Sequence, residues 1–141
     1  MNKSVLLVES NPENESLTLH ALKNSKLGNE VAVVRDGAEA LGYLLEAGRE
    51  PHALPELVLL NLELPEVDGL EVLRHLRNDE RTKVLPVVVL STEDSPGLLD
   101  YYGANGFIRK PVTSAKLVES ARQLGLHWLV SDEASSAGKK P

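Results

Sequence analysis

The chain contains no cysteine, so neither a disulfide nor a thiolate-bound metal is possible in it. No apolar run approaches the roughly 18 residues that a membrane-spanning helix needs, and the opening MNKSVLLVES is too short in apolar residues for a secretory signal. An excess of basic residues is also lacking, because the net charge is −6. Binding to nucleic acid or to an anionic membrane would require a basic face. We therefore expect a cytoplasmic protein that binds neither.

What is present is enough for one folded domain. The chain has 141 residues, of which 42% are hydrophobic, and shows no internal repeat. A chain of this length buries a proper core. We predict one domain over residues 1–130, including a C-terminal helical extension. The small polar tail 131–141, SDEASSAGKKP, is predicted to be disordered.

Short β-branched and leucine-rich runs alternate with helical patterns along the chain. Strands are predicted at 4–8, 30–34, 56–61, 85–91 and 106–110. Helices are predicted at 12–25, 36–48, 69–79 and 113–130, with a short one after Pro96. In the first helix, Leu17, Ala21 and Leu22 are expected to face the core. The alternation predicts an α/β fold with a doubly wound parallel sheet whose strands are buried on both faces.

Polar side chains stand where four of these strands end. The first strand is followed by Glu9 and Ser10, the third ends in Asn61, the fourth in Ser91, and the fifth in Lys110. In an open parallel sheet, ligands bind outside the carboxyl ends of the strands. These residues are therefore the candidates for function.

Five stretches in order carry a resemblance to a known family: VLLVESNP, VVRDGAEAL, LVLLNLELPEVDGLEVL, LPVVVLST and GANGFIRKPV. Over residues 3–125 the chain resembles the CheY-like receiver domain of two-component response regulators. The stretches RTKVLPVVVLST and HWLV further resemble single-domain regulators that accompany bacterial phytochrome kinases. The resemblance implies a five-stranded sheet of order 2-1-3-4-5 and a sensor histidine kinase as partner, with a bacteriophytochrome as the candidate.

The chemistry of that family implies a role for each strand end. In the family, an aspartate after the third strand becomes an acyl phosphate, and Mg²⁺ bridges it to two acidic residues after the first strand. A hydroxyl and a lysine bind the phosphoryl oxygens, and an aromatic on the fifth strand moves with the hydroxyl. By resemblance, Ser91 is the hydroxyl, Lys110 the lysine, Phe107 the aromatic and Glu9 the first acidic residue. At Glu63 the family uses the backbone carbonyl as a metal ligand.

Two positions depart from the family pattern. Asn61 stands at the phosphoacceptor position, and Ser10 stands where the second acidic residue is expected. An amide is a poor nucleophile, so Asn61 cannot form an acyl phosphate. With only Glu9 and Lys110 charged, the pocket is predicted to be neutral and to bind no Mg²⁺, which prefers carboxylate oxygens. We expect a hydrogen-bonded plug, in which Asn61 accepts from Lys110 and donates to Ser91 or Glu9.

The sequence thus predicts a protein that is not an enzyme and works through phosphorylation-independent contacts, as a homodimer or with a kinase. The expected interface residues are Tyr101, Tyr102, Leu126, Trp128 and Leu129. An alternative is a phosphorylatable receiver, present here as a natural variant or an engineered off-state. It would need another acceptor, and neither Asp36 nor Asp68 replaces Asn61 convincingly. A flavodoxin-like cofactor binder is disfavoured because ESNPEN lacks a phosphate loop rich in Ser, Thr and Gly.

Overall fold

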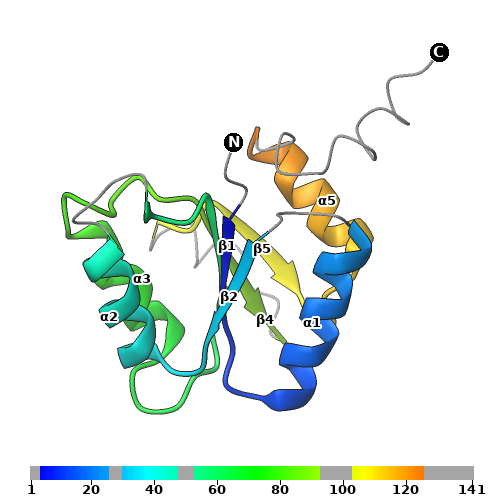
Figure 1. Cartoon of the computed structure of the whole chain (residues 1–141), viewed down its shortest axis with the longest axis horizontal. Helices are drawn as coiled ribbons and strands as arrows, with labels where there is room; N and C mark the ends of the chain where they lie inside the picture. The colour runs from blue at the N-terminus through cyan, green and yellow to red at the C-terminus, as the bar shows by residue number, and fades with distance from the viewer. Residues whose placement is uncertain (1–3, 26–29, 48–52, 93–102, 126–141) are drawn as a thin grey trace.

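The computed structural model describes residues 4–25, 30–47, 53–92 and 103–125. Five strands alternate with helices (Figure 1). The strands are β1 (Ser4–Val8), β2 (Glu30–Val34), β3 (Leu57–Asn61), β4 (Val87–Ser91) and β5 (Gly106–Arg109). The helices are α1 (Pro12–Ser25), α2 (Gly37–Ala47), α3 (Gly69–Arg77) and α5 (Ser114–Gln123). The short helix predicted after Pro96 lies outside the described residues.

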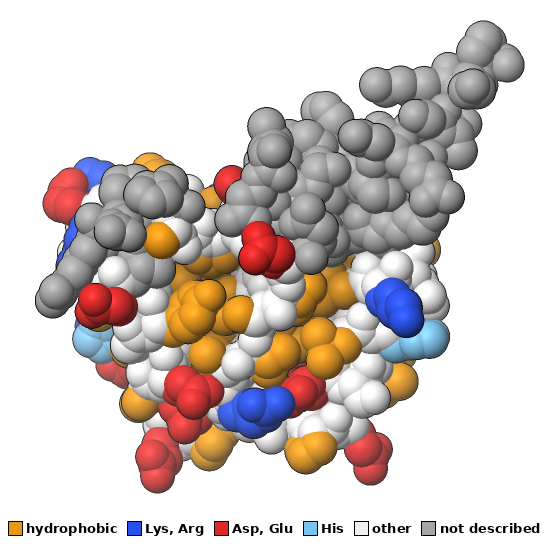
Figure 2. Space-filling view, in the orientation of Figure 1, with side chains coloured by type: hydrophobic (Ala, Val, Ile, Leu, Met, Phe, Trp, Pro, Cys, Tyr) orange, Lys and Arg blue, Asp and Glu red, His pale blue; other side chains and the backbone are white. Residues whose placement is uncertain are grey.

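The strands form one parallel sheet in the order β2-β1-β3-β4-β5, which confirms the predicted architecture. All residues of β3 and β4 are buried, and so is β1 except for its first residue. The edge strands differ from the prediction, because β2 and β5 are partly exposed. Figure 2 shows hydrophobic side chains gathered in the middle of this face of the molecule, and Val31 on β2 is among the exposed ones.

Two layers of helices cover the sheet, one on each face (Figure 1). Helices α2 and α3 pack on one face through Leu44, Leu73 and Leu76. Helices α1 and α5 pack on the other through Leu22 and Leu117. None of the helices in the described ranges combines the length and the apolar character needed to span a bilayer.

The helix starts follow the sequence signals. Asn11 accepts from the Asn14 N–H at 3.0 Å, and Thr113 accepts from the Lys116 N–H at 3.2 Å, each capping a helix. Asp68 caps α3, and Gly69 follows it. A Cβ at Gly69 would lie 2.6 Å from the Asn61 carbonyl oxygen, so only glycine lets the start of α3 lie against the end of β3.

Two predictions about the helices are wrong. Leu17 is 55% exposed, and the buried residues of α1 are Thr18, Ala21, Leu22 and Ser25. These follow the i, i+3, i+4, i+7 spacing of one helix face, which Leu17 does not share. The last helix was predicted to reach residue 130, but α5 ends at Gln123. Gly125 has a φ of 73°, a left-handed conformation that ends helices.

Candidate functional site

The sheet brings the predicted residues together at the carboxyl ends of its strands. Asn61 is aligned with Leu90, and the Lys110 N–H donates to the Ser91 carbonyl at 2.8 Å. Parallel strands end at one edge, which explains how residues so far apart in sequence meet. We call this group the strand-end cluster, defined by Glu9, Asn61, Glu63, Ser91 and Lys110.

The Asn61 side chain is the centre of the cluster. Its Nδ2 donates to Glu9 Oε2 at 2.7 Å and to the Glu63 carbonyl at 3.0 Å. Its Oδ1 accepts from the Glu63 N–H at 3.4 Å. The opposite amide orientation would set Oδ1 against two acceptors, so the chemistry of the neighbours fixes the orientation. The predicted hydrogen bond to Glu9 is therefore present, but Oδ1 accepts from Glu63 and not, as expected, from Lys110.

The Glu9 carboxylate is fully buried and is held by three groups. Besides Asn61, the Asn11 N–H donates to Oε2 at 3.3 Å, and Lys110 Nζ lies 3.2 Å from Oε1. The lysine side chain is itself only 8% exposed. Within the described residues Oε1 accepts no hydrogen bond, so Lys110 compensates it by charge and not by an aligned hydrogen bond. Removing either partner would leave a buried charge uncompensated.

The Glu63 carboxylate is the functional group that sequence reasoning missed. Ser91 Oγ donates to Glu63 Oε2 at 2.6 Å. The resemblance drew attention to the Glu63 carbonyl alone, although an acidic side chain two residues beyond Asn61 was visible in the sequence. The pocket therefore holds two carboxylates and one ammonium. With the exposed Glu63 included, the formal charge at the site is −1, whereas the predicted neutral charge counted Glu9 and Lys110 alone.

The other predicted residues take less part. Ser10 is half-buried beside Glu9 and makes no hydrogen bond to the strand-end cluster. Phe107 is half-buried on β5 and packs against the core under α2 and α3. The predicted interface residues lie outside the described residues: Tyr101, Tyr102, Leu126, Trp128 and Leu129.

The donor set of the cluster does not fit Mg²⁺. The family's metal ligands include the carboxylate at Glu9 and the carbonyl at Glu63, and here both accept from one N–H₂ group, that of Asn61. Mg²⁺ requires oxygen ligands directed at the ion, whereas Nδ2 directs hydrogens into that space. In the described ranges, no three or more Asp, Glu or His side chains are grouped so as to hold a metal ion.

Comparisons with known proteins agree with this fold. The family described as "Response regulator receiver domain" matches residues 5–122. The solved bacteriophytochrome response regulator RtBRR is 42% identical, with a TM-score of 0.80, over 89% of this chain and 79% of that one. The corresponding regulator AtBRR is 40% identical, with a TM-score of 0.77, over 91% and 96% of the two chains.

Two further relatives extend the comparison. The probable methanogenesis regulatory protein FilR2 of Methanothrix harundinacea is 35% identical over 89% of this chain and 83% of its own length. The receiver domain of sensor histidine kinase PA1611 from Pseudomonas aeruginosa PAO1 was solved with magnesium in its active-site cleft. It is 28% identical, with a TM-score of 0.71, over 89% of this chain and 99% of that one.

Proposed function

The chain belongs to the response regulator receiver domain family, and from this premise we propose that it signals without being phosphorylated and without Mg²⁺. Receiver domains are signalling modules of two-component systems. This one acts through protein contacts that need no phosphoryl transfer, and it is not an enzyme. We infer a cytoplasmic location, where such partners are found.

The hydrogen bonds of Asn61 carry the proposal. One amide nitrogen satisfies both Glu9 Oε2 and the Glu63 carbonyl, at 2.7 and 3.0 Å. It does so without a positive ion and without leaving a nucleophile. Asn61 is 2% exposed, so a phosphodonor also has little access to it. The amide closes the site in which its relatives carry out their chemistry.

The two alternative acceptors considered from the sequence are already engaged in helix caps. Asp68 Oδ1 accepts from the Glu71 N–H at 2.9 Å, and Asp36 Oδ1 accepts from the Glu39 N–H at 2.7 Å. A carboxylate used as a cap would have to leave its helix in order to attack a phosphodonor. These contacts favour the phosphorylation-independent reading over a phosphorylatable receiver.

Incubation with radiolabelled acetyl phosphate and Mg²⁺ tests the proposal. We expect no label on the parent protein, while a phosphorylatable receiver run in parallel becomes labelled. A Mg²⁺ titration followed by amide NMR shifts should likewise leave residues 9, 61, 63 and 110 unmoved. Base-labile label on any aspartate would refute the proposal.

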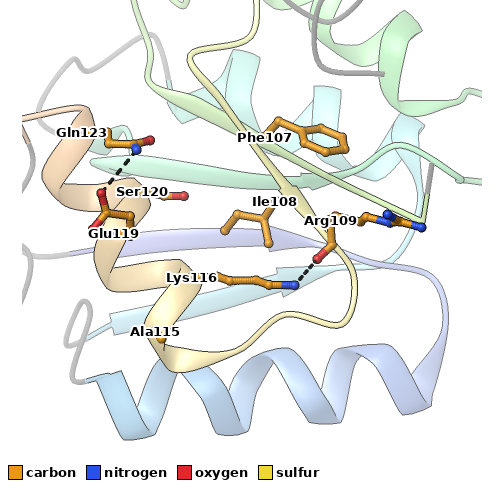
Figure 3. A pocket seen from close by; sticks show the side chains of 8 residues that line it. All are labelled: Phe107, Ile108, Arg109, Ala115, Lys116, Glu119, Ser120 and Gln123. Atoms are coloured by element: carbon orange, nitrogen blue, oxygen red, sulfur yellow. Dashed lines mark hydrogen bonds between the residues drawn. The ribbon is translucent and has the colours of Figure 1, made fainter. Parts of the chain in front are cut away.

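For partners, we propose a sensor histidine kinase and a second copy of the chain. The similarity to RtBRR, whose name marks it as a bacteriophytochrome response regulator, supports a bacteriophytochrome as the kinase. A groove of about 410 Å³ between β5 and α5 supports contact with a second copy. Ile108 points toward α5 there, Phe107 points to the other side of β5, and Lys116 Nζ reaches the Arg109 carbonyl at 2.8 Å (Figure 3).

Light scattering tests the homodimer. We expect a dimer at tens of micromolar, roughly the range of a weak interface. Removal of residues 124–141, which contain apolar residues predicted to lie in the interface, should give a monomer. A monomer at that concentration in the full chain would contradict this part of the proposal and leave the phosphorylation claim untouched.

A further inference from the structure

Ser91, the last residue of β4, is completely buried, yet its hydroxyl meets a carboxylate. The distance from Ser91 Oγ to Glu63 Oε2 is 2.6 Å. An ionised carboxylate only accepts, so the hydroxyl must donate. The distance lies in the range of charge-assisted O–H···O⁻ bonds, about 2.5–2.7 Å, which are stronger than neutral ones. The hydroxyl is thus oriented by an anionic oxygen.

Asn61 holds the backbone from which this carboxylate projects. It accepts from the Glu63 N–H at 3.4 Å and donates to the Glu63 carbonyl at 3.0 Å. The neighbouring Leu62 N–H donates to the Leu90 carbonyl at 2.9 Å, which ties the same turn to β4. The side chain of Glu63 is therefore presented to Ser91 by a backbone held on both sides.

The two carboxylates of the strand-end cluster have different surroundings. Glu9 is compensated by Lys110 and by the Asn61 amide. Glu63 makes no ion pair with any cation in the described ranges, and its one side-chain hydrogen bond is the one from Ser91. Its charge is directed at the hydroxyl that, by family resemblance, binds a phosphoryl oxygen.

We propose that Glu63 is a positioning residue, whose carboxylate holds the Ser91 hydroxyl as a phosphoryl oxygen holds it in phosphorylated relatives. The inference rests on the proposed function, since a site that is never phosphorylated must supply this anion from within the chain. It goes further by naming the state of the protein: the end of β4 is kept permanently in the anion-bound arrangement.

The state of Ser91 is connected to the exposed edge of the sheet by β5. Ser91 is aligned with Arg109, its carbonyl accepts from the Lys110 N–H at 2.8 Å, and Val89 is aligned with Phe107. A change in how Ser91 is held should therefore reach residues 106–110, which adjoin the groove proposed for a second copy.

Amide NMR of three variants tests the role of the carboxylate. Glu63→Ala should shift the amides of β4 and of residues 106–110, and Ser91→Ala should shift the same set in the same direction. The double variant should add little to either. Glu63→Gln keeps an acceptor oxygen but removes the charge, so it should shift the same amides by less than Glu63→Ala does. Glu66→Gln removes an exposed charge from the same loop and serves as the matched control.

Inorganic phosphate, compared with sodium chloride of equal ionic strength, separates an anion site from simple structural support. In Glu63→Ala, phosphate should return the β5 amides toward their parent positions, and it should fail in Glu63→Ala/Ser91→Ala. The proposal is overturned if the β5 amides do not respond to Glu63→Ala, if chloride acts as well as phosphate, or if phosphate also restores the double variant. Acetyl phosphate labelling of the parent would instead refute the proposed function.

Discussion

Two polar clusters lie at opposite ends of the same strands and hold their central side chains differently. The strand-end cluster lies beyond the carboxyl ends and is centred on a neutral amide between charged neighbours. The second, which we call the arginine cluster, lies at the amino ends of β4 and β5. It is centred on a cation among uncharged acceptor oxygens and consists of Arg77, Thr82, Lys83, Gly103 and Asn105.

Arg77, the last residue of α3, donates to four uncharged oxygens. These are the carbonyls of Gly103 at 2.9 Å, Thr82 at 3.4 Å and Lys83 at 3.3 Å, and Asn105 Oδ1 at 2.8 Å. Asn105 Oδ1 also accepts from the Val87 N–H at 2.8 Å, where β4 begins. Burial of the half-buried guanidinium lowers the pKa of Arg77 by desolvation.

The difference shows which polar cluster depends on its charges. In the strand-end cluster, an amide in place of a carboxylate changes the net charge and hence the affinity for metal and phosphate. Among the described residues, the charge of the arginine cluster has no partner of opposite sign, and the planar fork of donors is what connects helix, loop and strand. The stability of the first cluster should depend on Mg²⁺ once its charges are restored. The stability of the second should depend only on the geometry of its hydrogen bonds.

The largest effect is expected from Asn61→Asp in EDTA. The change removes both amide donors and places a second carboxylate where Nδ2 now lies 2.7 Å from Glu9 Oε2. Because both residues are buried, we expect a loss of about 3 kcal/mol in the free energy of unfolding, as for an uncompensated buried charge. Urea denaturation at pH 7 measures it, and a variant as stable as the parent would contradict the assigned hydrogen bonds.

A second substitution should convert this loss into metal binding. Ser10→Asp together with Asn61→Asp supplies the missing carboxylates, with Lys110 and Ser91 already in place. The double variant should regain stability when Mg²⁺ is added and should accept phosphate from acetyl phosphate, whereas each single variant does so poorly. A melting temperature indifferent to Mg²⁺ would show that the cluster cannot be returned to the family's metal site.

Next in size is Arg77→Ala, which leaves the oxygens around it without their donors. We expect a loss of about 2 kcal/mol, the cost of leaving several acceptors, two of them part-buried, without their donors. Arg77→Lys keeps the charge but loses the planar fork of donors, and should restore less than half of the lost free energy of unfolding. Neither variant should respond to Mg²⁺ in thermal unfolding. Full recovery by lysine would mean that charge, and not geometry, holds this end of the sheet.

The sequence predicted the two clusters unequally, and the reason is physical. Strand ends, caps and the meeting of Glu9, Asn61, Ser91 and Lys110 follow from local signals and from the parallel sheet. The partner of each polar atom depends on side-chain directions that spacing does not encode. Hence Glu63 was considered only for its carbonyl, and Lys110 was assigned to Asn61 and not to Glu9.

The arginine cluster was not predicted at all. Its acceptors are mostly backbone carbonyls, which every residue has, so no pattern of residue types marks them. Arg77 at the end of a helix reads as an ordinary exposed cation with a favourable dipole interaction. Leu17 was predicted to face the core for a related reason. The helical pattern of apolar residues in this segment is equally plausible with or without Leu17.

A smaller effect is expected from Thr82→Val, which tests a single side-chain hydrogen bond within the arginine cluster. Thr82 is fully buried and its Oγ1 donates to the Leu76 carbonyl at 2.7 Å. Valine keeps the shape and loses the donor, so we expect a loss of about 1 kcal/mol, typical of one hydrogen bond. Thr92→Val, at an exposed position, is the control in urea denaturation. Equal midpoints for the two variants would show that Arg77 alone fixes this loop.

The smallest effect should come from an exposed ion pair in the same loop. Arg81 donates to Asp79 Oδ1 at 2.9 Å and to Oδ2 at 2.8 Å, and these hydrogen bonds lower the pKa of the Asp79 carboxyl to about 2. A lowered carboxylate pKa stabilises the folded state above the unfolded pKa, here 3.8, and this contribution is lost as the pH falls from there toward 2. Asp79→Asn should remove that step from a plot of unfolding free energy against pH and leave stability at pH 7 nearly unchanged, since exposed pairs contribute little. The step should also shrink in high salt, which screens an exposed pair. If the pH-dependent change in unfolding free energy remains in the Asp79→Asn variant and in high salt, it must arise from other groups. The strand-end cluster, with its two carboxylates, would then be the place to look.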